Sequence, residues 1–118
     1  MSIQVAKSAA TETPLISLGK GAEIDDIWST DDVDSEKPMS CGIFVQKKDD
    51  EPFEYTYGYH EVKIILEGTI TLEDRSQGIK IVAKAGDVLK IAKGTTVTFS
   101  SESSGRAFYT GQRKLRDF

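Results

Sequence analysis

The sequence predicts an all-β domain of the sandwich or barrel type. Short stretches rich in Val, Ile, Thr, Phe and Tyr recur along the chain, and clusters of Gly, Asp, Ser and Pro separate them. Nowhere does an apolar stripe of helical period persist for three turns. Seven or more short strands with this spacing indicate a β-sandwich or a β-barrel.

Length and composition fit a single domain. A chain of 118 residues can bury a core without disulfides or a structural metal. Hydrophobic residues make up 38% and charged residues 29% of it, which is typical of a globular protein and not of a disordered or fibrous one. We expect an N-terminal arm over residues 1–20 and a barrel over residues 21–118.

Charge and hydropathy exclude two classes of partner. The net charge is -4, and only the tail RKLRDF is locally basic, whereas nucleic-acid binding requires a concentrated basic surface. No apolar run approaches the roughly 20 residues of a membrane span, and the first residues lack the features of a signal peptide. We therefore expect a cytoplasmic protein with no nucleic-acid partner and no membrane partner.

The elements can be assigned in order. Around the apolar patch PLISL the first residues read as an arm, and residues 22–38 read as a short strand followed by a solvated acidic loop. This loop lacks the oxygen spacing and the glycine of a twelve-residue calcium loop. The strands expected beyond it cover residues 40–46, one long strand bent at Gly58 over 53–67, then 68–74, 79–84, two strands within 85–101, and 106–115.

Two other kinds of side chain were considered as reactive groups. The lone Cys41 lies within an apolar strand, which predicts a packed thiol and not a nucleophile. Arg106, Arg113 and Arg116 could clamp an anion, but charges near a chain end are more often solvated.

The tyrosine-rich stretch EYTYGYHEVK presents an unusual face. Alternate residues of a strand point to the same side, which places together Tyr55, Tyr57, Tyr59, Glu61 and Lys63. Three phenols, a carboxylate and an ammonium are more than a core or a solvent face needs. We expect them to line a chamber.

Two motifs resemble those of the cupins. The first cupin motif has six residues between a glutamate and a glycine, and Glu61 and Gly68 match it. The second motif has a glycine, a proline and a glycine, which correspond here to Gly86, Ala92 and Gly94 in GDVLKIAKG. The resemblance implies a double-stranded β-helix, or jelly-roll barrel.

The segments YTYGYHE, GDV and AFYTGQR, preceded by MSCGIF, are in the order found in the small single-domain cupins of the ethanolamine-utilisation-protein-like (EutQ-like) family. This resemblance covers roughly residues 20 to 115. It implies a homodimer and an association with acetate kinase activity. However, the stretches GKGAE and GTT lack the pattern of a phosphate-binding loop, so nothing in the sequence supports the kinase activity.

The resemblance also allows a metal site to be checked. Metal cupins present two histidines, a glutamate and a third histidine, and the corresponding positions here hold Tyr55, Tyr57, Glu61 and Val97. A chain with one histidine cannot build a three-histidine site, and His60 should point away from Glu61. We expect no metal and no cofactor. An irregular site that uses Glu61, His60 or tyrosine oxygens with waters stays open as an alternative.

A small molecule is the expected ligand of the chamber. Tyr55 and Tyr57 would contact it, and Val97 and Phe99 on the opposite strand would supply an apolar wall. A mostly apolar cavity with a few convergent polar groups is the usual form of a small-molecule site.

The catalytic candidates are Glu61, Tyr59 and Lys63. A partly buried carboxylate can act as a general acid or base, a phenol can stabilise a developing enolate, and an ammonium can pair with a substrate carboxylate. These roles predict metal-independent proton transfer in a small carbonyl or carboxylate compound, of isomerase, lyase or cyclase type. The alternatives are a non-catalytic small-molecule-binding module, a dimeric assembly module whose rings simply fill the barrel, and a metal-dependent cupin with irregular ligands.

Overall fold

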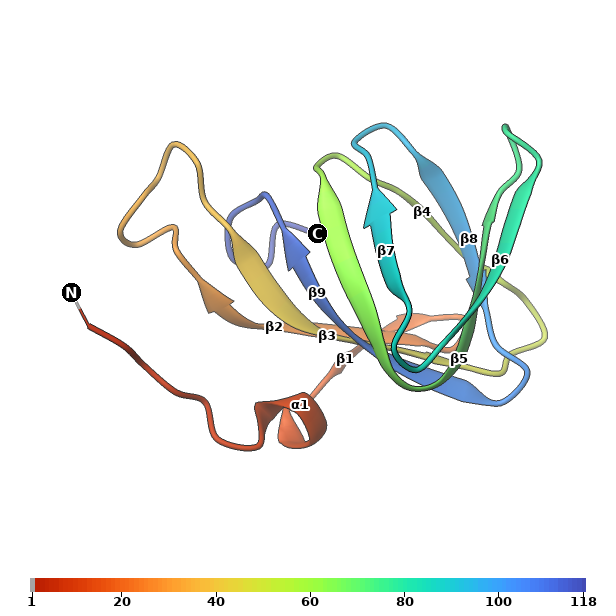
Figure 1. Cartoon of the computed structure of the whole chain (residues 1–118), viewed down its shortest axis with the longest axis horizontal. Coiled ribbons are helices and arrows are strands. Elements are labelled where there is room, and N and C mark those ends of the chain that lie inside the picture. The colour runs from red at the N-terminus through yellow and green to blue at the C-terminus, as the bar shows by residue number, and fades with distance from the viewer. Residues whose placement is uncertain (1) are drawn as a thin grey trace.

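The computed structural model describes residues 2–118 and contains one short helix and nine strands (Figure 1). The elements are α1 (Ala9–Glu12), β1 (Ile16–Gly19), β2 (Ala22–Ser29), β3 (Ser40–Lys47), β4 (Phe53–Thr56), β5 (Glu61–Asp74), β6 (Ile79–Lys84), β7 (Val88–Ile91), β8 (Thr96–Ser100) and β9 (Ser104–Gly111). The predicted all-β class is confirmed. Among the described residues the only helix is a four-residue turn, far too short to cross a membrane.

The long strand β5 joins two antiparallel layers into a nearly closed barrel (Figure 1). Its first half pairs with β9 and β7, in the layer that continues through β3 and β2 to β1. Its second half pairs with β6 and β8, and β8 pairs in turn with β4. The register of β5 against β9 shifts between Ile65 and Glu67, just before Gly68 takes a φ of 68°. This bulge and glycine let one strand bend from one layer into the other.

The long strand predicted over residues 53–67 is wrong, because the chain leaves the sheets between β4 and β5. In this break the backbone bonds to neighbouring loops: Tyr57 N donates to the Thr95 carbonyl at 2.9 Å, and the His60 carbonyl accepts from Gln112 N at 3.0 Å. The separate strand predicted over residues 68–74 is the second half of β5. The remaining strands lie where the sequence places them, except that the final strand is Ser104–Gly111. Within the predicted arm, β1 pairs with β2. The division into arm and barrel stays a prediction.

The core lies between the two layers, where side chains of alternate residues meet. Its largest fully buried members include Tyr109, Phe99, Ile65 and Ile70. Cys41 is not in this core: it lies half-buried on the outer side of β3, and burial raises the pKa of its thiol, so it is a poor nucleophile.

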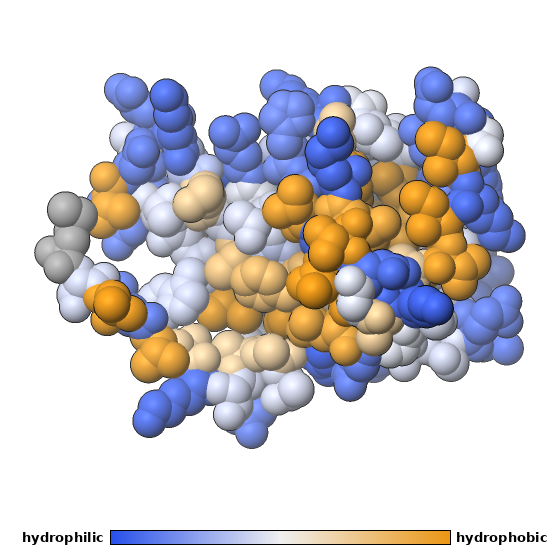
Figure 2. All heavy atoms as spheres, in the orientation of Figure 1, coloured by the Kyte–Doolittle hydropathy of each residue, from blue (hydrophilic) through white to orange (hydrophobic). Residues whose placement is uncertain are grey.

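Apolar side chains also remain on the outer face of the barrel. Val62 and Leu66 on β5 and Val88 on β7 are exposed, and Figure 2 shows apolar surface gathered over the middle of the molecule.

Candidate functional site

The five predicted chamber residues do converge inside the barrel, although they do not share one strand. Tyr55 comes from β4, Tyr57 and Tyr59 from the break in the sheets, and Glu61 and Lys63 from the start of β5. All five line one interior cavity. The alternation argument therefore gave the right direction for these side chains, while the backbone that delivers them is irregular.

A buried ion pair forms the floor of this cavity. Lys63 Nζ lies 3.3 Å from Glu61 Oε2, and each side chain is at most 3% exposed. The same carboxylate oxygen accepts a hydrogen bond from the Tyr57 hydroxyl at 2.8 Å. The ammonium also lies 4.5 Å from the ring centroid of Phe44 and 4.9 Å from that of Phe99. The carboxylate and the two ring faces together offset the cost of removing the ammonium from water.

The tyrosines form a cluster above the ion pair. The rings of Tyr55 and Tyr57 meet edge to face at 4.9 Å, those of Tyr57 and Tyr59 at 5.5 Å, and the hydroxyls of Tyr55 and Tyr59 are 3.2 Å apart. Burial, followed by the hydrogen bond to Tyr55 for Tyr59 and the charge of Glu61 for Tyr57, raises the pKa of both phenols. Both therefore stay protonated and can act as hydrogen-bond donors at neutral pH.

The interior cavity is much smaller than the sequence suggested. Its volume is about 20 Å³, close to the space that one water needs. Phe99 lines it as predicted. Val97 does not: it is buried opposite Tyr55 and lines a separate groove against Ile79 and Ile81 of β6. The barrel in this state is filled largely by its own rings.

A second buried ion pair, which the sequence did not predict, closes one end of the barrel. The Asp26 carboxylate accepts hydrogen bonds from Arg113 Nη1 at 2.7 Å and Nη2 at 2.8 Å, from the Tyr109 hydroxyl at 2.5 Å and from Arg116 N at 2.7 Å. Arg113 is 4% exposed, so its expected solvation is wrong. Burial alone raises the pKa of Asp26, but the hydrogen bonds from Arg113, Tyr109 and Arg116 outweigh burial and lower it.

Phe118 lies next to this pair. Its ring centroid is 5.0 Å from the guanidinium carbon of Arg113, and it lines the interior cavity together with Tyr55 and Tyr59. A period-two pattern could have found Asp26, because Ala22 and Ile24 precede it on the inward face of β2.

The residues at the metal position of a cupin do not fit a metal ion. Tyr55 and Tyr57 replace two histidines, Val97 is apolar, and Glu61 is already paired with an ammonium. No group of three or more potential ligands from His, Cys, Asp and Glu comes together within residues 2–118. His60 is exposed, and its Nδ1 accepts a hydrogen bond from Lys93 N at 3.0 Å. The irregular metal site through His60 and Glu61 therefore finds no support in the geometry.

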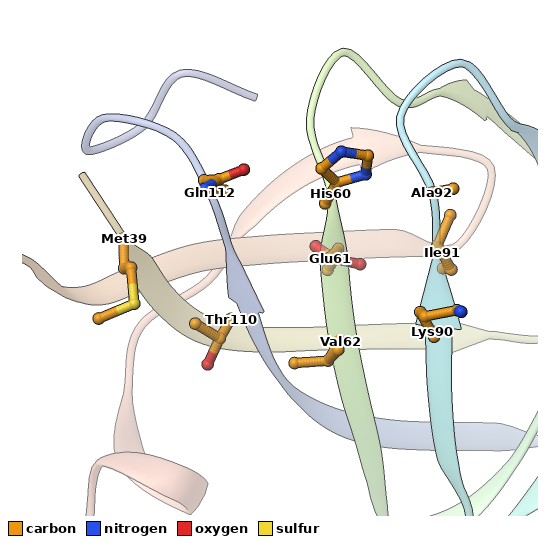
Figure 3. A pocket seen from close by; sticks show the side chains of 9 residues that line it. All are labelled: Met39, His60, Glu61, Val62, Lys90, Ile91, Ala92, Thr110 and Gln112. Carbon is orange, nitrogen blue, oxygen red and sulfur yellow. The ribbon is translucent and has the colours of Figure 1, made fainter. Parts of the chain in front are cut away.

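His60 instead borders a hollow of about 490 Å³ on the outer face of β9, β5 and β7 (Figure 3). Figure 3 shows His60 directly before the first residue of β5 and beside Ala92. Gln112 lies across from it, on the chain that follows β9. The hollow is open to solvent, and its walls are mainly apolar. Its lining residues are Met39, His60, Glu61, Val62, Lys90, Ile91, Ala92, Thr110 and Gln112.

Comparison with known proteins identifies the family. Residues 1–112 match the family described as ethanolamine utilisation protein EutQ. The chain belongs to the EutQ family. It is 34% identical over 89 residues to the acetate kinase EutQ of Salmonella typhimurium, a match that covers 75% of this chain and 38% of the relative. The chain thus spans well under half the length of this relative.

Solved structures agree with this assignment. The crystal structure of an ethanolamine utilization protein Q from Salmonella typhimurium is similar with a TM-score of 0.65 and 28% identity, covering 77% of this chain and 68% of that one. An RmlC-like cupin from Shewanella frigidimarina has the same TM-score at 15% identity, covering 90% and 87% of the two chains. The predicted cupin barrel is confirmed.

The same comparison corrects the predicted reaction. The expected proton-transfer chemistry of isomerase, lyase or cyclase type is wrong, because the relative is named an acetate kinase, which transfers a phosphoryl group. The place of Glu61, Tyr59 and Lys63 in a substrate site stays a prediction.

Proposed function

We propose that this EutQ-family chain takes part in phosphoryl transfer to a small carboxylate, as in an acetate kinase, and that the barrel holds the carboxylate. One observation carries the proposal: a fully buried lysine, Lys63, lies inside the barrel of a chain that is 34% identical to an acetate kinase over 89 residues. Glu61 and two ring faces offset the cost of burying this ammonium, and its remaining donors can bind a negatively charged substrate.

Phosphoryl transfer makes modest demands on the protein. A carboxylate oxygen of the acceptor attacks the terminal phosphorus of a nucleoside triphosphate, and the bond from that phosphorus to the leaving diphosphate oxygen breaks. Catalysis of such a step is mainly positioning and stabilisation of charge, so no protein nucleophile is required. The barrel needs only to bind and orient the carboxylate.

Lys63 is suited to this role. An ammonium has three donors, and Glu61 is its one oxygen partner in the structure. A ligand carboxylate could share the ammonium with Glu61, while the Tyr57 hydroxyl keeps the Glu61 charge partly neutralised. The rings of Phe44 and Phe99 beside Nζ would then contact the methyl group of an acetate-sized ligand.

The outer hollow is a weaker candidate for the carboxylate. Its one ammonium, that of Lys90, stands on an exposed strand at an open surface, where solvent screens its charge. Solvent screens charges far less in the cavity at Lys63, so a carboxylate that takes part of the place of Glu61 beside the ammonium would interact with it more strongly there.

The nucleotide is not assigned to the barrel. No glycine-rich loop opens a long helix in the described part of the chain, where α1 has four residues. The curated relative extends well beyond the matched 38% of its length. The barrel residues thus account for the carboxylate side of the reaction. A cytoplasmic location and a homodimeric state stay predictions.

Acetyl phosphate formation tests the proposal. The purified chain is incubated with ATP, Mg²⁺ and acetate, and acetyl phosphate is trapped as the hydroxamate. The double variant Glu61→Gln with Lys63→Met removes both charges and avoids an unpaired buried carboxylate. We expect kcat/KM to fall by about 100-fold in it, as when one stabilising donor is lost. Lys90→Met, on the exposed face, is the matched control and should leave the rate unchanged.

Two outcomes would contradict different parts of the proposal. If the unmodified chain neither produces acetyl phosphate above the buffer rate nor binds acetate, the proposed function fails. If the double variant matches the unmodified chain, the chain is a kinase but its carboxylate site lies elsewhere.

A further inference from the structure

We infer that Phe118 is a gate over the mouth of the barrel and that it sets the size of the carboxylate that reaches Lys63. The part about carboxylates rests on the proposed function. The gate itself depends only on the arrangement of side chains at the mouth.

The interior cavity is lined mainly by aromatic rings, and Leu18 and Ile24 are its aliphatic lining residues. Phe118 packs on the core cluster and lines the interior cavity with Tyr55 and Tyr59. Below these rings lie Tyr57, Glu61 and Lys63, each less than 5% exposed. A cavity of about 20 Å³ has no room for acetate, so at least one of the lining side chains must move before a ligand can enter.

The tyrosines are poorly suited to move. Tyr59 shares a hydrogen bond with Tyr55 at 3.2 Å and packs against Gly111, whose absent Cβ would come within 3.0 Å of the Tyr59 ring. Tyr57 donates to Glu61 and is held by backbone bonds to Thr95 and Gly94. Moving any of them would break hydrogen bonds in a buried site.

Phe118 has no such restraint. Its side chain makes no hydrogen bond, and it is held by contact with the core and with the Arg113 guanidinium at 5.0 Å. It is also only partly buried, so its ring can turn into solvent.

The chain before Phe118 forms a fixed base for such a movement. Asp26 binds both the Arg113 side chain and Arg116 N, and Asp31 Oδ2 accepts from Leu115 N at 2.9 Å. Arg113 lies between two rings, with its guanidinium carbon 5.1 Å from the centroid of Tyr59 and 5.0 Å from that of Phe118. The Arg113–Asp26 pair therefore positions the gate and stays intact when the Phe118 ring moves.

The gate also limits ligand size. When the Phe118 ring closes again over a bound ligand, the space beside Lys63 is bounded by Phe44 and Phe99, which suits a ligand with a single methyl group. Replacing Phe118 by alanine would remove the outer wall and admit a longer alkyl chain. If Phe118 had only a structural role, Phe118→Ala would lower the stability of the fold without changing the access of ligands to Lys63.

Access to Lys63 can be measured without any kinase assay. Cyanate is a small reagent that carbamoylates amines, since the amine adds across the carbon–nitrogen bond of isocyanic acid. Carbamoylation of Lys63 and of the exposed Lys90 is followed by peptide mass spectrometry in the unmodified chain, in Phe118→Ala and in Leu115→Ala. Leu115 is the matched control, because it lies in the same segment, is 40% exposed and does not line the cavity.

We expect Phe118→Ala to raise the Lys63 rate, relative to Lys90, by at least about tenfold, and Leu115→Ala to leave it unchanged. Equal Lys63 rates in the unmodified chain and a folded Phe118→Ala would overturn the gate. If Phe118→Ala loses cooperative unfolding, Phe118→Leu replaces it and should show a smaller rise in the same direction. No rise in Phe118→Leu would equally reject the gate.

Protection by ligands tests the size limit. Acetate should slow Lys63 carbamoylation in both proteins, whereas butyrate should slow it only in Phe118→Ala. Butyrate protection in the unmodified chain would overturn the size limit. Failure of acetate to protect either protein would refute the carboxylate site of the proposed function, while the gate would still stand on the rate difference.

Discussion

Replacing Asp26 by asparagine is expected to destabilise the fold strongly, because this side chain is the counter-ion of a buried arginine. The carboxylate accepts four hydrogen bonds, at 2.5 Å from Tyr109, at 2.7 and 2.8 Å from Arg113 and at 2.7 Å from Arg116 N. Asparagine keeps one acceptor oxygen and turns an amide donor toward groups that are themselves donors. The Arg113 charge would remain buried without a partner.

The size of the effect follows from the burial of the pair. Both side chains are at most 3% exposed, and breaking one partner of such a pair costs about 3–5 kcal/mol. A domain of this size has a total stability of about 5–15 kcal/mol, so the loss is a large fraction of it. At roughly 3–5 °C per kcal/mol, the midpoint of thermal unfolding should fall by roughly 9–25 °C.

Urea unfolding followed by far-UV circular dichroism measures this loss. The matched control is Asp25→Asn on the neighbouring residue. Its pair with Arg116 is partly exposed, with the Arg116 side chain 53% and the Asp25 side chain 15% exposed, and asparagine keeps an oxygen that can accept from Asp26 N. Exposed pairs contribute at most about 1 kcal/mol, so this variant should unfold close to the unmodified chain. A free energy of unfolding for Asp26→Asn within about 1 kcal/mol of that control would refute the reasoning.

Three further predictions concern the same buried groups. Because hydrogen bonds from Arg113, Tyr109 and Arg116 hold the pKa of Asp26 below 3.8 despite burial, its stabilisation is complete above that pH and is lost as the pH falls through the lower folded value. The free energy of unfolding, measured with urea, should therefore fall more between about pH 5 and pH 2 in the unmodified chain than in Asp26→Asn. Parallel plots of this free energy against pH for the two proteins would contradict the prediction. Lys63→Met alone should cost about 3–5 kcal/mol of unfolding free energy, because it leaves the buried Glu61 carboxylate unpaired. Adding Glu61→Gln should restore most of this loss. If the double variant is as unstable as Lys63→Met, the unpaired charge is not the cause of the loss. Gly42→Ala should cost about 1–3 kcal/mol or more of unfolding free energy, since its Cβ would collide with the Asp25 carbonyl oxygen and the Tyr109 hydroxyl. The control Gly58→Ala places its Cβ in open space and should unfold almost like the unmodified chain. Similar urea midpoints for the two variants would contradict the packing at β3.

The strands were predictable because each carries its own local pattern. Stretches such as residues 40–46 and 79–84 combine β-branched residues with bordering turn residues, and these features do not depend on distant partners. The break between β4 and β5 was not predictable in this way. It exists because the backbone of residues 57–60 bonds to loops around Thr95 and Gln112, which are distant in the sequence.

The site was predictable in direction but not in size. Period-two alternation correctly brought Tyr55, Glu61 and Lys63 to the interior, even across the break. The volume left among them depends on how rings from several strands pack, and on Phe118 at the other end of the chain. No local pattern carries that information.

Buried charge and reaction type were the hardest to predict. The position of Asp26 on the inward face of β2 is visible in the alternation, but its partner Arg113 lies 87 residues away and resembled a solvated terminal charge. The reaction could not be deduced from Glu61, Tyr59 and Lys63, because the same three groups suit proton transfer or anion binding equally well. The name of the Salmonella typhimurium relative, an acetate kinase, and not the residue types, contradicts the proton-transfer prediction.

A crystal structure of the unmodified chain saturated with acetate would test the carboxylate site most directly. We expect a carboxylate to lie within about 3 Å of Lys63 Nζ, with its methyl group against Phe44 and Phe99 and with the Phe118 ring closed over it. Acetate bound only outside the barrel, with Lys63 still paired to Glu61 alone beneath a closed Phe118, would contradict the account.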